Sequence, residues 1–521
     1  MTDQNHNVYA RLARGFPSER DACAVEAGHG GYYTWDDIER ASAMMANVLR
    51  QSGLRPGDRV AVQVDKSVES LMLYLATVRA GYIYLPLNTA YRAREMEYFL
   101  ADAKPGVVVC APKDFAWLSR IAFRYGAMHV YTLGDDCRGS LLARAVYCQD
   151  RFQTVYSAPD DLAAIIYTSG TTGRSKGAML THANLVSNAE VLKVFWRWRP
   201  NDVLLHALPL FHVHGLFVAC HGALMNGSKM IFIDKFDAAK IIARLPEASV
   251  YMGVPTHYVR FLAQAGLNRH AARNMRLFVS GSAPLLTETF EQFARVSGHV
   301  ILERYGMSET IMLVSNPCDG PRIGGTVGIP LPGVEVRIVD AAGHLVPCGQ
   351  VGSIEVRGPN VFKGYWGMPE KTAEEFTGDG FFKTGDLGIW GERDTPAQGY
   401  LSIVGRSKDL IISGGYNVYP KEVESFIDQM PGVVESAIIG LPHPEFGEAV
   451  TAIVVAQPGT SPDETTLIAA LKGTIAHFKV PKRVFFIDQL PRNTMGKVQK
   501  NMLRERFQAV SGSELNAQPM P

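Results

Sequence analysis

The first hundred residues alternate short apolar strands with helical segments, and this alternation limits the chain to a few architectures. The segments RVAVQV (59–64) and YIYLPL (82–87) are apolar enough for burial on both faces, and the helical pattern SVESLMLYLATVRAG (67–81) separates them. Thr34 and Asp37 predict a capping box for an earlier helix that Gly53 would end. Strand, helix, strand is the order of βαβ units in a largely parallel sheet.

The alternation continues along the chain and then changes twice. Four further apolar strands are expected at DVLLHALPL (202–210), KMIFID (229–234), SVYMGVP (249–255) and MRLFVSGS (275–282). From about residue 326 the strands become shorter, with Gly and Pro turns, and after GRSKDL (405–410) a separate small domain begins. The sequence therefore predicts an α/β fold. Residues 1–405 form a large N-terminal domain of parallel sheets with a small β-rich subdomain, and residues 406–521 form a small α+β C-terminal domain.

Charge and cysteine content narrow the class of protein. The formal net charge is +1 with no long basic block, so nucleic acid and anionic membranes are not expected as partners. The seven cysteines are scattered and form no C-x-x-C pair, as expected for reduced thiols. The first twenty residues lack the apolar core of a signal peptide, and no apolar stretch is long enough to span a bilayer. We therefore expect a cytoplasmic protein.

The stretch YTSGTTGRSKGAML (167–180) has the composition of a phosphate-binding loop. Its hydroxyls, exposed backbone N–H groups and positive charges suit a polyphosphate, although its spacing differs from G-x-x-x-x-G-K-[ST]. A flexible surface turn is the alternative reading of such composition. The candidate phosphate ligands are Thr168, Ser169, Gly170, Thr171, Thr172, Gly173 and Lys176.

Four later motifs follow this loop in a fixed order: YGMSET (305–310), FKTGDLG (382–388), GRSKDLIISGGYNVYPKEVE (405–424) and LPRNTMGKVQK (490–500). Together the five motifs resemble the adenylate-forming superfamily of acyl-CoA synthetases, luciferases and peptide-synthetase adenylation domains. The resemblance covers essentially the whole chain. It implies that a carboxylate is activated with ATP to an acyl-adenylate, that pyrophosphate is released, and that the acyl group passes to the thiol of CoA. ATP, Mg²⁺ and CoA are the implied cofactors and substrates.

The resemblance also assigns roles to individual residues. Lys497 would contact the substrate carboxylate and the α-phosphate, where charge migrates in the transition state. Glu309, with Thr168, would hold Mg²⁺, while Asp386 would accept hydrogen bonds from the ribose hydroxyls near Arg406. The remaining implied nucleotide ligands are Ser280, Gly281, Ser282, Ala283, Glu303, Arg304, Tyr305, Gly306, Met307 and Ser308.

Two half-reactions require two arrangements of the small domain in this superfamily. The resemblance places the hinge at Lys408 in the G-R-x-[DK] motif, and it places the glycine turn Ser413, Gly414 and Gly415 beside the CoA tunnel. Without the resemblance, Gly414 and Gly415 would read as a simple turn.

The acid-binding segments resemble those of malonyl-CoA synthetases. HALPLFHVHGLF, GVPTHYVR and MRLFVSGSAPLL carry histidines and arginines where a pocket for long or aromatic acids would be apolar. A dicarboxylic acid buries a second carboxylate, which a bidentate arginine pairs best. We expect Arg260 in this role, with His212, also a catalytic candidate, and Arg174 assisting; Arg276 and Met307 are further candidates. Zinc binding by His212 and His214 lacks a partner at metal spacing.

The sequence departs from these relatives at two places, and it leaves several alternative functions open. Residues 391–399 are longer than the turn in relatives, and Ile311 replaces a small residue, which leaves malonate and methylmalonate open. The alternatives are a short-chain or aryl monocarboxylate ligase, an amino-acid adenylation enzyme, a luciferase and a non-catalytic nucleotide-binding protein. No G-x-S-x-G elbow or G-x-G-x-x-G motif supports a serine hydrolase or a dinucleotide fold. A monomer or homodimer is expected.

Overall fold

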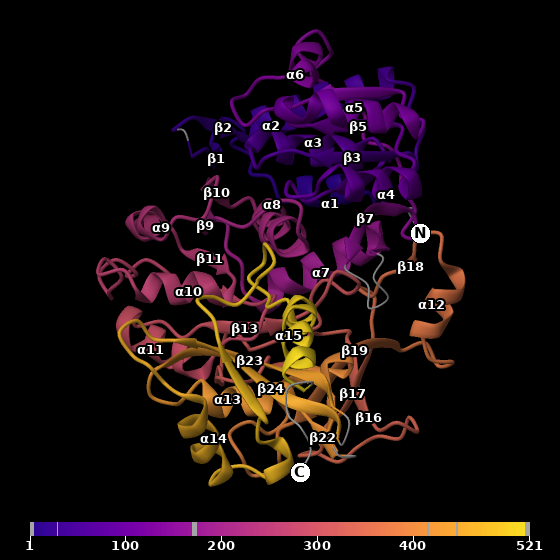
Figure 1. Cartoon of the computed structure of the whole chain (residues 1–521). Coiled ribbons are helices and arrows are strands. Elements are labelled where there is room, and N and C mark those ends of the chain that lie inside the picture. Colours follow the sequence, from indigo (N-terminus) through magenta and orange to yellow (C-terminus); the bar gives the residue numbers. More distant parts are fainter. Residues whose placement is uncertain (1–4, 29, 169–174, 414–415, 444–445, 516–521) are drawn as a thin grey trace. The chain divides into compact units, whose positions relative to one another are not determined.

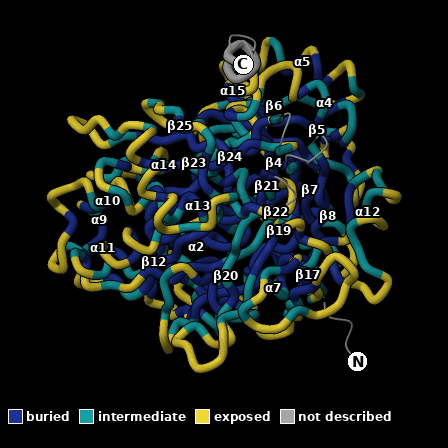
Figure 2. Tube along the Cα trace, turned by 60° about the horizontal axis from the view of Figure 1, so that its bottom comes forward, coloured by how far each residue is buried: buried dark blue, intermediate teal, exposed yellow. Residues whose placement is uncertain are grey.

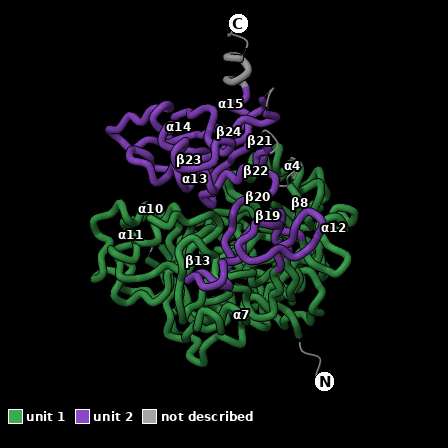
Figure 3. The backbone as a smooth tube through the Cα atoms, turned by 90° about the horizontal axis from the view of Figure 1, so that it is seen from below, with its two compact units in different colours: residues 1–336, 356–382 green, residues 337–355, 383–521 purple. Residues whose placement is uncertain are grey.

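The computed structural model describes residues 5–28, 30–168, 175–413, 416–443 and 446–515. The chain forms two compact units, which Figure 3 shows in different colours. Unit 1 comprises residues 1–336 and 356–382, and unit 2 comprises residues 337–355 and 383–521. The predicted α/β class is confirmed, with parallel sheets in the large N-terminal part and a small α+β part at the C terminus. The domain boundary between residues 405 and 406 stays a prediction.

A nine-stranded sheet in unit 1 runs parallel from β13 through β1 (Figure 1). Because these strands are parallel, their carboxyl ends lie along one edge, where side chains of many ligand-binding sites gather. The strand order is β15 (Ile329–Pro330), β14 (Val314–Ser315), β13 (Leu302–Tyr305), β12 (Leu277–Ser280), β11 (Val250–Gly253), β9 (Val203–His206), β10 (Lys229–Phe232), β1 (Cys23–Glu26) and β2 (Tyr32–Thr34).

A seven-stranded sheet forms the rest of the β structure of unit 1. Its strands are parallel from β7 to β6, and β8 and β18 extend it in antiparallel pairing. The order is β18 (Gly364–Tyr365), β8 (Lys176–Thr181), β7 (Leu162–Thr168), β4 (Ile83–Pro86), β3 (Arg59–Gln63), β5 (Val107–Cys110) and β6 (His129–Thr132).

In the described part of unit 1, twelve α-helices connect or cover these strands. They are α1 (Val8–Ala13), α2 (Trp35–Gln51), α3 (Val68–Arg79), α4 (Ala93–Ala103), α5 (Phe115–Arg124), α6 (Ser140–Ala145), α7 (His182–Phe195), α8 (His221–Asn226), α9 (Ala238–Arg244), α10 (Pro255–Leu262), α11 (Thr287–Ser297) and α12 (Pro369–Glu375). A π-helix (His214–Cys220) leads into α8. Among the described residues, no helix is both long enough and apolar enough to cross a membrane.

Local sequence explains where α2 begins and ends. The Thr34 side chain accepts a hydrogen bond from the Asp37 backbone N–H, and the Asp37 carboxylate accepts one from the Thr34 backbone, so the predicted capping box is confirmed. After the helix, Gly53 adopts φ +82°, a left-handed conformation that glycine takes at little cost. Capping of this kind contributes about 1 kcal/mol to helix stability.

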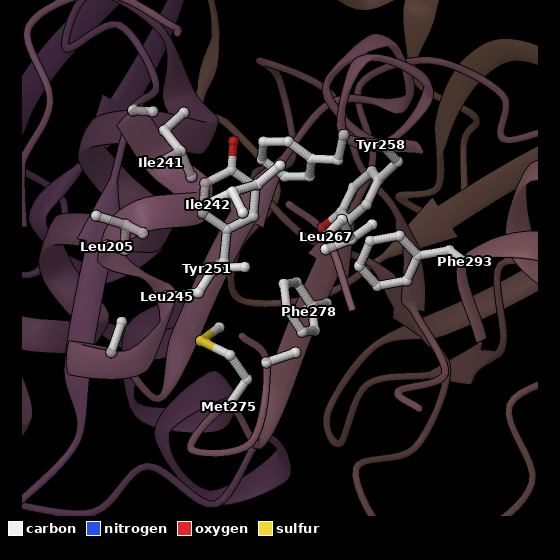
Figure 4. Packing of buried hydrophobic residues seen from close by; sticks show 14 of the residues in the cluster. Leu205, Ile241, Ile242, Leu245, Tyr251, Tyr258, Leu267, Met275, Phe278 and Phe293 are labelled. Atoms are coloured by element: carbon white, nitrogen blue, oxygen red, sulfur yellow. The ribbon is translucent and has the colours of Figure 1, made fainter. Parts of the chain in front are cut away.

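Aromatic side chains dominate the core on one side of the nine-stranded sheet (Figure 4). Tyr258 packs edge-on against Phe293, with ring centroids 5.1 Å apart, and Phe278 packs against the same ring at 4.9 Å. Each fully buried side chain of this size contributes about 1.5–3 kcal/mol through the area it removes from water. Figure 2 shows buried backbone around β12. This core packs against β9, β10, β11 and β12 and therefore helps to hold the edge at their carboxyl ends.

Among the described residues, two further sheets and three α-helices lie wholly or mainly in unit 2. The first sheet has the order β16 (Glu335–Val339), β17 (Gly352–Arg357), β19 (Phe382–Trp390) and β20 (Leu401–Arg406). The second has the order β22 (Tyr416–Val418), β21 (Ile411–Ser413), β24 (Gly447–Ala456) and β23 (Val433–His443), and β25 (Arg483–Phe486) pairs with β24. The helices are α13 (Pro420–Ile427), α14 (Glu464–Lys472) and α15 (Lys500–Leu515). The helix expected near 463–478 thus ends at Lys472, just before Gly473.

The charged form of buried Asp428 lowers the stability of unit 2, and removing this charge is expected to stabilise the protein. Burial raises the pKa of Asp428 to about 6, while the Ser436 hydroxyl donates a 2.7 Å hydrogen bond to its carboxyl group. The folded state therefore holds the proton more tightly than the unfolded state, and this stabilisation is lost as the pH rises through 6. Asp428→Asn keeps an acceptor for Ser436, and we expect it to raise the free energy of unfolding at pH 7.5 by about 1–2 kcal/mol.

The measurement is urea unfolding of the full chain at pH 7.5 and pH 5, with the exposed Asp488→Asn as the matched control. The gain should shrink at the lower pH, because the wild-type carboxyl is then largely protonated in the folded state. An equal gain at both pH values would show that the charge of Asp428 is not its cause.

Candidate active site

The phosphate end of the candidate site lies where β7 joins β8 in unit 1. The strands pair Thr168 with Lys176, and the connecting residues Ser169, Gly170, Thr171, Thr172, Gly173 and Arg174 lie outside the described residues. Lys176 is buried, and its ammonium lies 3.4 Å from a carboxylate oxygen of Glu375 and 4.2 Å from the centre of the Tyr365 ring. The structure thus holds one predicted phosphate ligand in a fixed position at the end of the loop.

Glu309 lies next to this phosphate end. Its buried carboxylate accepts hydrogen bonds from the Thr168 hydroxyl at 3.3 Å and from the Tyr365 hydroxyl at 3.1 Å, and its backbone oxygen accepts one from the Phe362 N–H at 2.8 Å. A carboxylate beside a hydroxyl offers the hard oxygen donors that Mg²⁺ prefers, and Mg²⁺ bound to a nucleotide needs few protein ligands. Glu309 and Thr168 therefore fit the predicted metal role. Among the described residues, no group of three His, Cys, Asp or Glu side chains could hold a metal ion, and this includes the surroundings of His212 and His214.

The nucleotide segments predicted from the sequence meet at the carboxyl edge of the nine-stranded sheet. Strand β12 ends at Ser280 and β13 pairs with it through Glu303, so the segments 280–283 and 303–308 are neighbours. Gly306 turns so tightly that an added Cβ would lie 1.9 Å from the backbone oxygen of Ile311. Ile311 is fully buried with φ +56°, a costly conformation for a β-branched residue that is found mainly at functional sites. Met307 and Ser308 lie in the turn between these two residues and are partly exposed.

Arg304 is the most unusual charged residue at this edge. The side chain is buried on β13, and burial lowers the pKa of its guanidinium to about 9. Its Nε and Nη2 atoms have no hydrogen-bond partner among the described residues. An added Cβ at Gly281 would lie 2.5 Å from the guanidinium, so only glycine leaves room for it there. A buried charge without a partner is costly, which points to an anionic ligand.

Neutral histidines lie close to Arg304. Burial, followed by the positive charge of Arg304, lowers the pKa of His212 to about 4 and that of His214 well below its ordinary value. The Ser282 hydroxyl lies 3.4 Å from Nδ1 of His214, and the Ser280 hydroxyl and Nε2 of His214 lack partners among the described residues. We call Ser280, Ser282, His214 and Arg304 the Arg304 cluster. Its available donors and its charge suit a carboxylate.

Two predicted acid ligands need correction. Arg260 is exposed on α10 with its guanidinium 5.6 Å from the Phe236 ring, so it is a surface arginine and not the buried partner expected for a carboxylate. Arg276 forms an ion pair with the buried Asp202, donating from Nε to the carboxylate at 2.7 Å. Arg276 directly precedes β12, and Asp202 directly precedes β9. This ion pair therefore lies at the amino edge of the sheet, at the opposite end of β12 from Ser280. Of these three arginines, Arg304 alone combines burial with a position at the carboxyl edge, next to Ser280.

Unit 2 brings together the other predicted groups. Asp386 on β19 pairs with Arg406 on β20, with 3.0 Å between the carboxylate and Nε. Lys497 lies in a tight loop in which the Asn493 side chain accepts a hydrogen bond from its backbone N–H at 2.9 Å. Burial, and then the positive charge of Arg406, lowers the pKa of Lys497 to about 8. Burial also lowers the pKa of Lys408, the predicted hinge, and Arg406 adds to the effect.

The CoA segment is described only in part. Ser413 is buried at the end of β21, paired with Tyr416 of β22. Gly414 and Gly415 lie outside the described residues. The extra segment 391–399 forms turns closed by a bridge between Gly391 and Gln398.

Comparisons with known proteins agree with this arrangement. The family model described as AMP-binding enzyme matches residues 10–366, and the AMP-binding enzyme C-terminal domain matches residues 422–497. A malonate–CoA ligase of Arabidopsis thaliana is 35% identical over 88% of this chain and 79% of its own length. A feruloyl-CoA synthase of an Amycolatopsis species is also 35% identical, over 93% of this chain and 96% of its own length. The crystal structure of ATP-bound MatB from Rhodopseudomonas palustris is 53% identical, with a TM-score of 0.94, and the match covers 97% of this chain and all of that chain.

Proposed function

The chain belongs to the AMP-binding enzyme family, and on this premise we propose that it is an AMP-forming malonate–CoA ligase. In the first half-reaction, a carboxylate oxygen of malonate attacks the α-phosphorus of ATP, and pyrophosphate leaves. In the second, the thiol sulfur of CoA attacks the acyl carbon and loses its proton, and AMP leaves. The products are malonyl-CoA, AMP and pyrophosphate.

Similarity to known enzymes supports malonate as the acid. Malonate–CoA ligases of Arabidopsis thaliana and Mus musculus are 35% and 33% identical to this chain, although a feruloyl-CoA synthase is also 35% identical. The residues of the site itself give a second criterion that does not depend on overall similarity.

The buried guanidinium of Arg304, whose Nε and Nη2 atoms lack hydrogen-bond partners among the described residues, is the observation that favours malonate. A ligand with one carboxylate uses it for adenylation, so it leaves these two nitrogens buried without a partner. Malonate brings a second carboxylate, which Arg304 can pair while Ser280 and His214 donate further hydrogen bonds. An aromatic acid such as ferulate would place apolar surface against this charge, at a cost of several kcal/mol. The Arg304 cluster thus favours a short dicarboxylate.

The neutral histidines strengthen this preference. Because burial keeps His212 and His214 uncharged near pH 7, the cluster carries the single positive charge of Arg304 and offers imidazole N–H donors beside it. One negative charge on the distal end of the acid therefore balances the cluster. His212 is proposed as an acid-binding residue on this basis.

We assign the other groups by their positions and chemistry. Lys176, at the end of the loop 169–174, would bind the departing phosphates. Asp386, beside Arg406, would accept hydrogen bonds from the ribose hydroxyls. Bound Mg²⁺ would neutralise phosphate charge, and Glu309 with Thr168 would hold it. Lys497 would stabilise the charge that moves during adenylation. Ser413 and the glycines after it would contact CoA, and Lys408 would act as the hinge between the two half-reactions.

Product analysis tests this function directly. The full chain is incubated with ATP, Mg²⁺, CoA and one acid from acetate, butyrate, malonate, methylmalonate, succinate and ferulate, and the thioesters are separated by mass. We expect malonyl-CoA, with equal amounts of AMP and pyrophosphate, as the fastest-formed product, and methylmalonate as the nearest competitor. Faster formation of acetyl-, butyryl- or feruloyl-CoA would contradict the proposal.

We also propose a cytoplasmic location, because all seven cysteines are free thiols in the structure. Cell fractionation that places the protein in an oxidising compartment would contradict this proposal.

A further inference from the structure

Tyr365 contacts two residues to which we assign phosphate-related roles, Glu309 and Lys176. Its hydroxyl donates to the Glu309 carboxylate at 3.1 Å, and the Lys176 ammonium lies 4.2 Å from the centre of its ring. The Tyr365 side chain therefore joins the carboxylate assigned to Mg²⁺ and the cation assigned to phosphate.

The backbone around Tyr365 is fixed on both sides. Tyr365 pairs with Ala178 in the same sheet that contains Lys176, and the Trp366 N–H donates to the Gly177 oxygen at 2.8 Å. The Tyr365 N–H donates to the Thr372 hydroxyl at 2.9 Å. With only 4% of the residue exposed, the ring has little freedom to move away from Lys176 or Glu309.

The two contacts suit two different tasks. The face of an aromatic ring attracts an ammonium without neutralising it, so Lys176 keeps its charge for phosphate. A hydroxyl that donates to a carboxylate orients the group and leaves its negative charge to attract a cation. Glu375 also pairs with Lys176, at 3.4 Å, but its negative charge competes with phosphate for the same ammonium.

We infer that Tyr365 is a positioning residue of the nucleotide site, whose hydroxyl orients Glu309 toward Mg²⁺ and whose ring holds Lys176 toward the phosphates. The inference rests on the proposed function, which assigns Lys176 and Glu309 their ligands. It predicts that the two tasks of Tyr365 are separable by substitution. Removing the hydroxyl affects the Mg²⁺-dependent part of ATP binding, and removing the ring also affects the part that needs no metal.

Isothermal titration calorimetry with ATP, in the absence of malonate, measures ATP binding with Mg²⁺ and without it. Tyr365→Phe keeps the ring, and we expect it to weaken ATP binding about 10-fold in Mg²⁺, while binding in EDTA stays within about 2-fold of wild type. Tyr365→Leu is expected to lose an additional factor of about 3–10 in Mg²⁺ and a similar factor in EDTA. Tyr33→Phe is the matched control, because the Tyr33 hydroxyl also bonds a carboxylate, that of Glu69, elsewhere in unit 1.

The results separate this inference from the proposed function. The positioning role is overturned if Tyr365→Phe binds ATP in Mg²⁺ as tightly as the wild type does, or if Tyr33→Phe loses as much affinity as Tyr365→Phe. This holds even if the wild-type chain makes malonyl-CoA. A loss of ATP affinity in Tyr365→Phe that occurs in Mg²⁺ and not in EDTA supports the role even if malonate proves to be the wrong acid. If Tyr365→Leu does not fold, as judged by its thermal unfolding, the comparison of Tyr365→Phe in Mg²⁺ and in EDTA still decides the question.

Discussion

Replacing Lys497 by alanine is expected to lower malonate-dependent ATP–pyrophosphate exchange by about 10²- to 10³-fold. The loss of a preorganised positive group at the place where charge develops in a transition state costs about this much. The pKa of Lys497 lies near 8, so the ammonium form predominates at pH 7 and declines at higher pH. In the wild-type protein, kcat/KM for malonate is therefore expected to fall as the pH rises through about 8.

The half-reaction measurement makes this prediction specific. Because Lys497 is assigned to adenylation, transfer of the acyl group from synthetic malonyl-adenylate to CoA should change much less in the variant. Lys472→Ala, which removes an exposed lysine at the end of α14, is the matched control and should leave both half-reactions unchanged. Undiminished exchange in Lys497→Ala would remove the adenylation role of this lysine.

Replacing Arg304 by leucine is expected to lower kcat/KM for malonate by about 10³-fold and to improve the use of butyrate relative to malonate. Leucine removes the only charge assigned to the distal carboxylate, so that malonate would bury this carboxylate without a partner. Butyrate has no such group, and its apolar end would pack against the new side chain. The variant should remain folded, because it removes a buried charge for which two nitrogens, Nε and Nη2, have no hydrogen-bond partner among the described residues.

Arg260→Leu provides the matched comparison, since Arg260 is exposed on α10. Initial rates with malonate and with butyrate are measured for the wild type and both variants. Arg260→Leu should keep the wild-type preference for malonate. A loss of that preference in Arg260→Leu, with Arg304→Leu unaffected, would return the acid-binding role to Arg260.

Much of the fold was predictable because local patterns determine it. Apolar strands buried on both faces identified β3, β4 and β9–β12, and a capping box identified α2. The π-helix His214–Cys220 was not predicted, because its apolar sequence has no feature that separates it from an α-helix. The final helix α15 also escaped prediction, since its polar sequence lacks a clear apolar face.

The site was predictable where motifs fix it and not where packing decides. The pairs Thr168–Glu309 and Asp386–Arg406 bring predicted residues together over long sequence separations. The choice of Arg260 as the acid-binding arginine stays a prediction that its exposure does not favour, because sequence alone does not tell which arginine is buried. An arginine at the end of the apolar strand ILERY was the available signal, since a charge within such a strand requires a partner. Tyr365 lies in no motif considered from the sequence, and its role follows only from the pairing of β18 with β8.

We propose that a second carboxylate selects the acid. ATP–pyrophosphate exchange with malonate and with monomethyl malonate tests this selection, because the monoester keeps the reacting carboxylate and replaces the distal one with an uncharged ester. With the ester, Arg304 stays buried and unpaired, so we predict that kcat/KM is at least about 10³-fold higher for malonate. Equal or faster exchange with the ester would contradict the account.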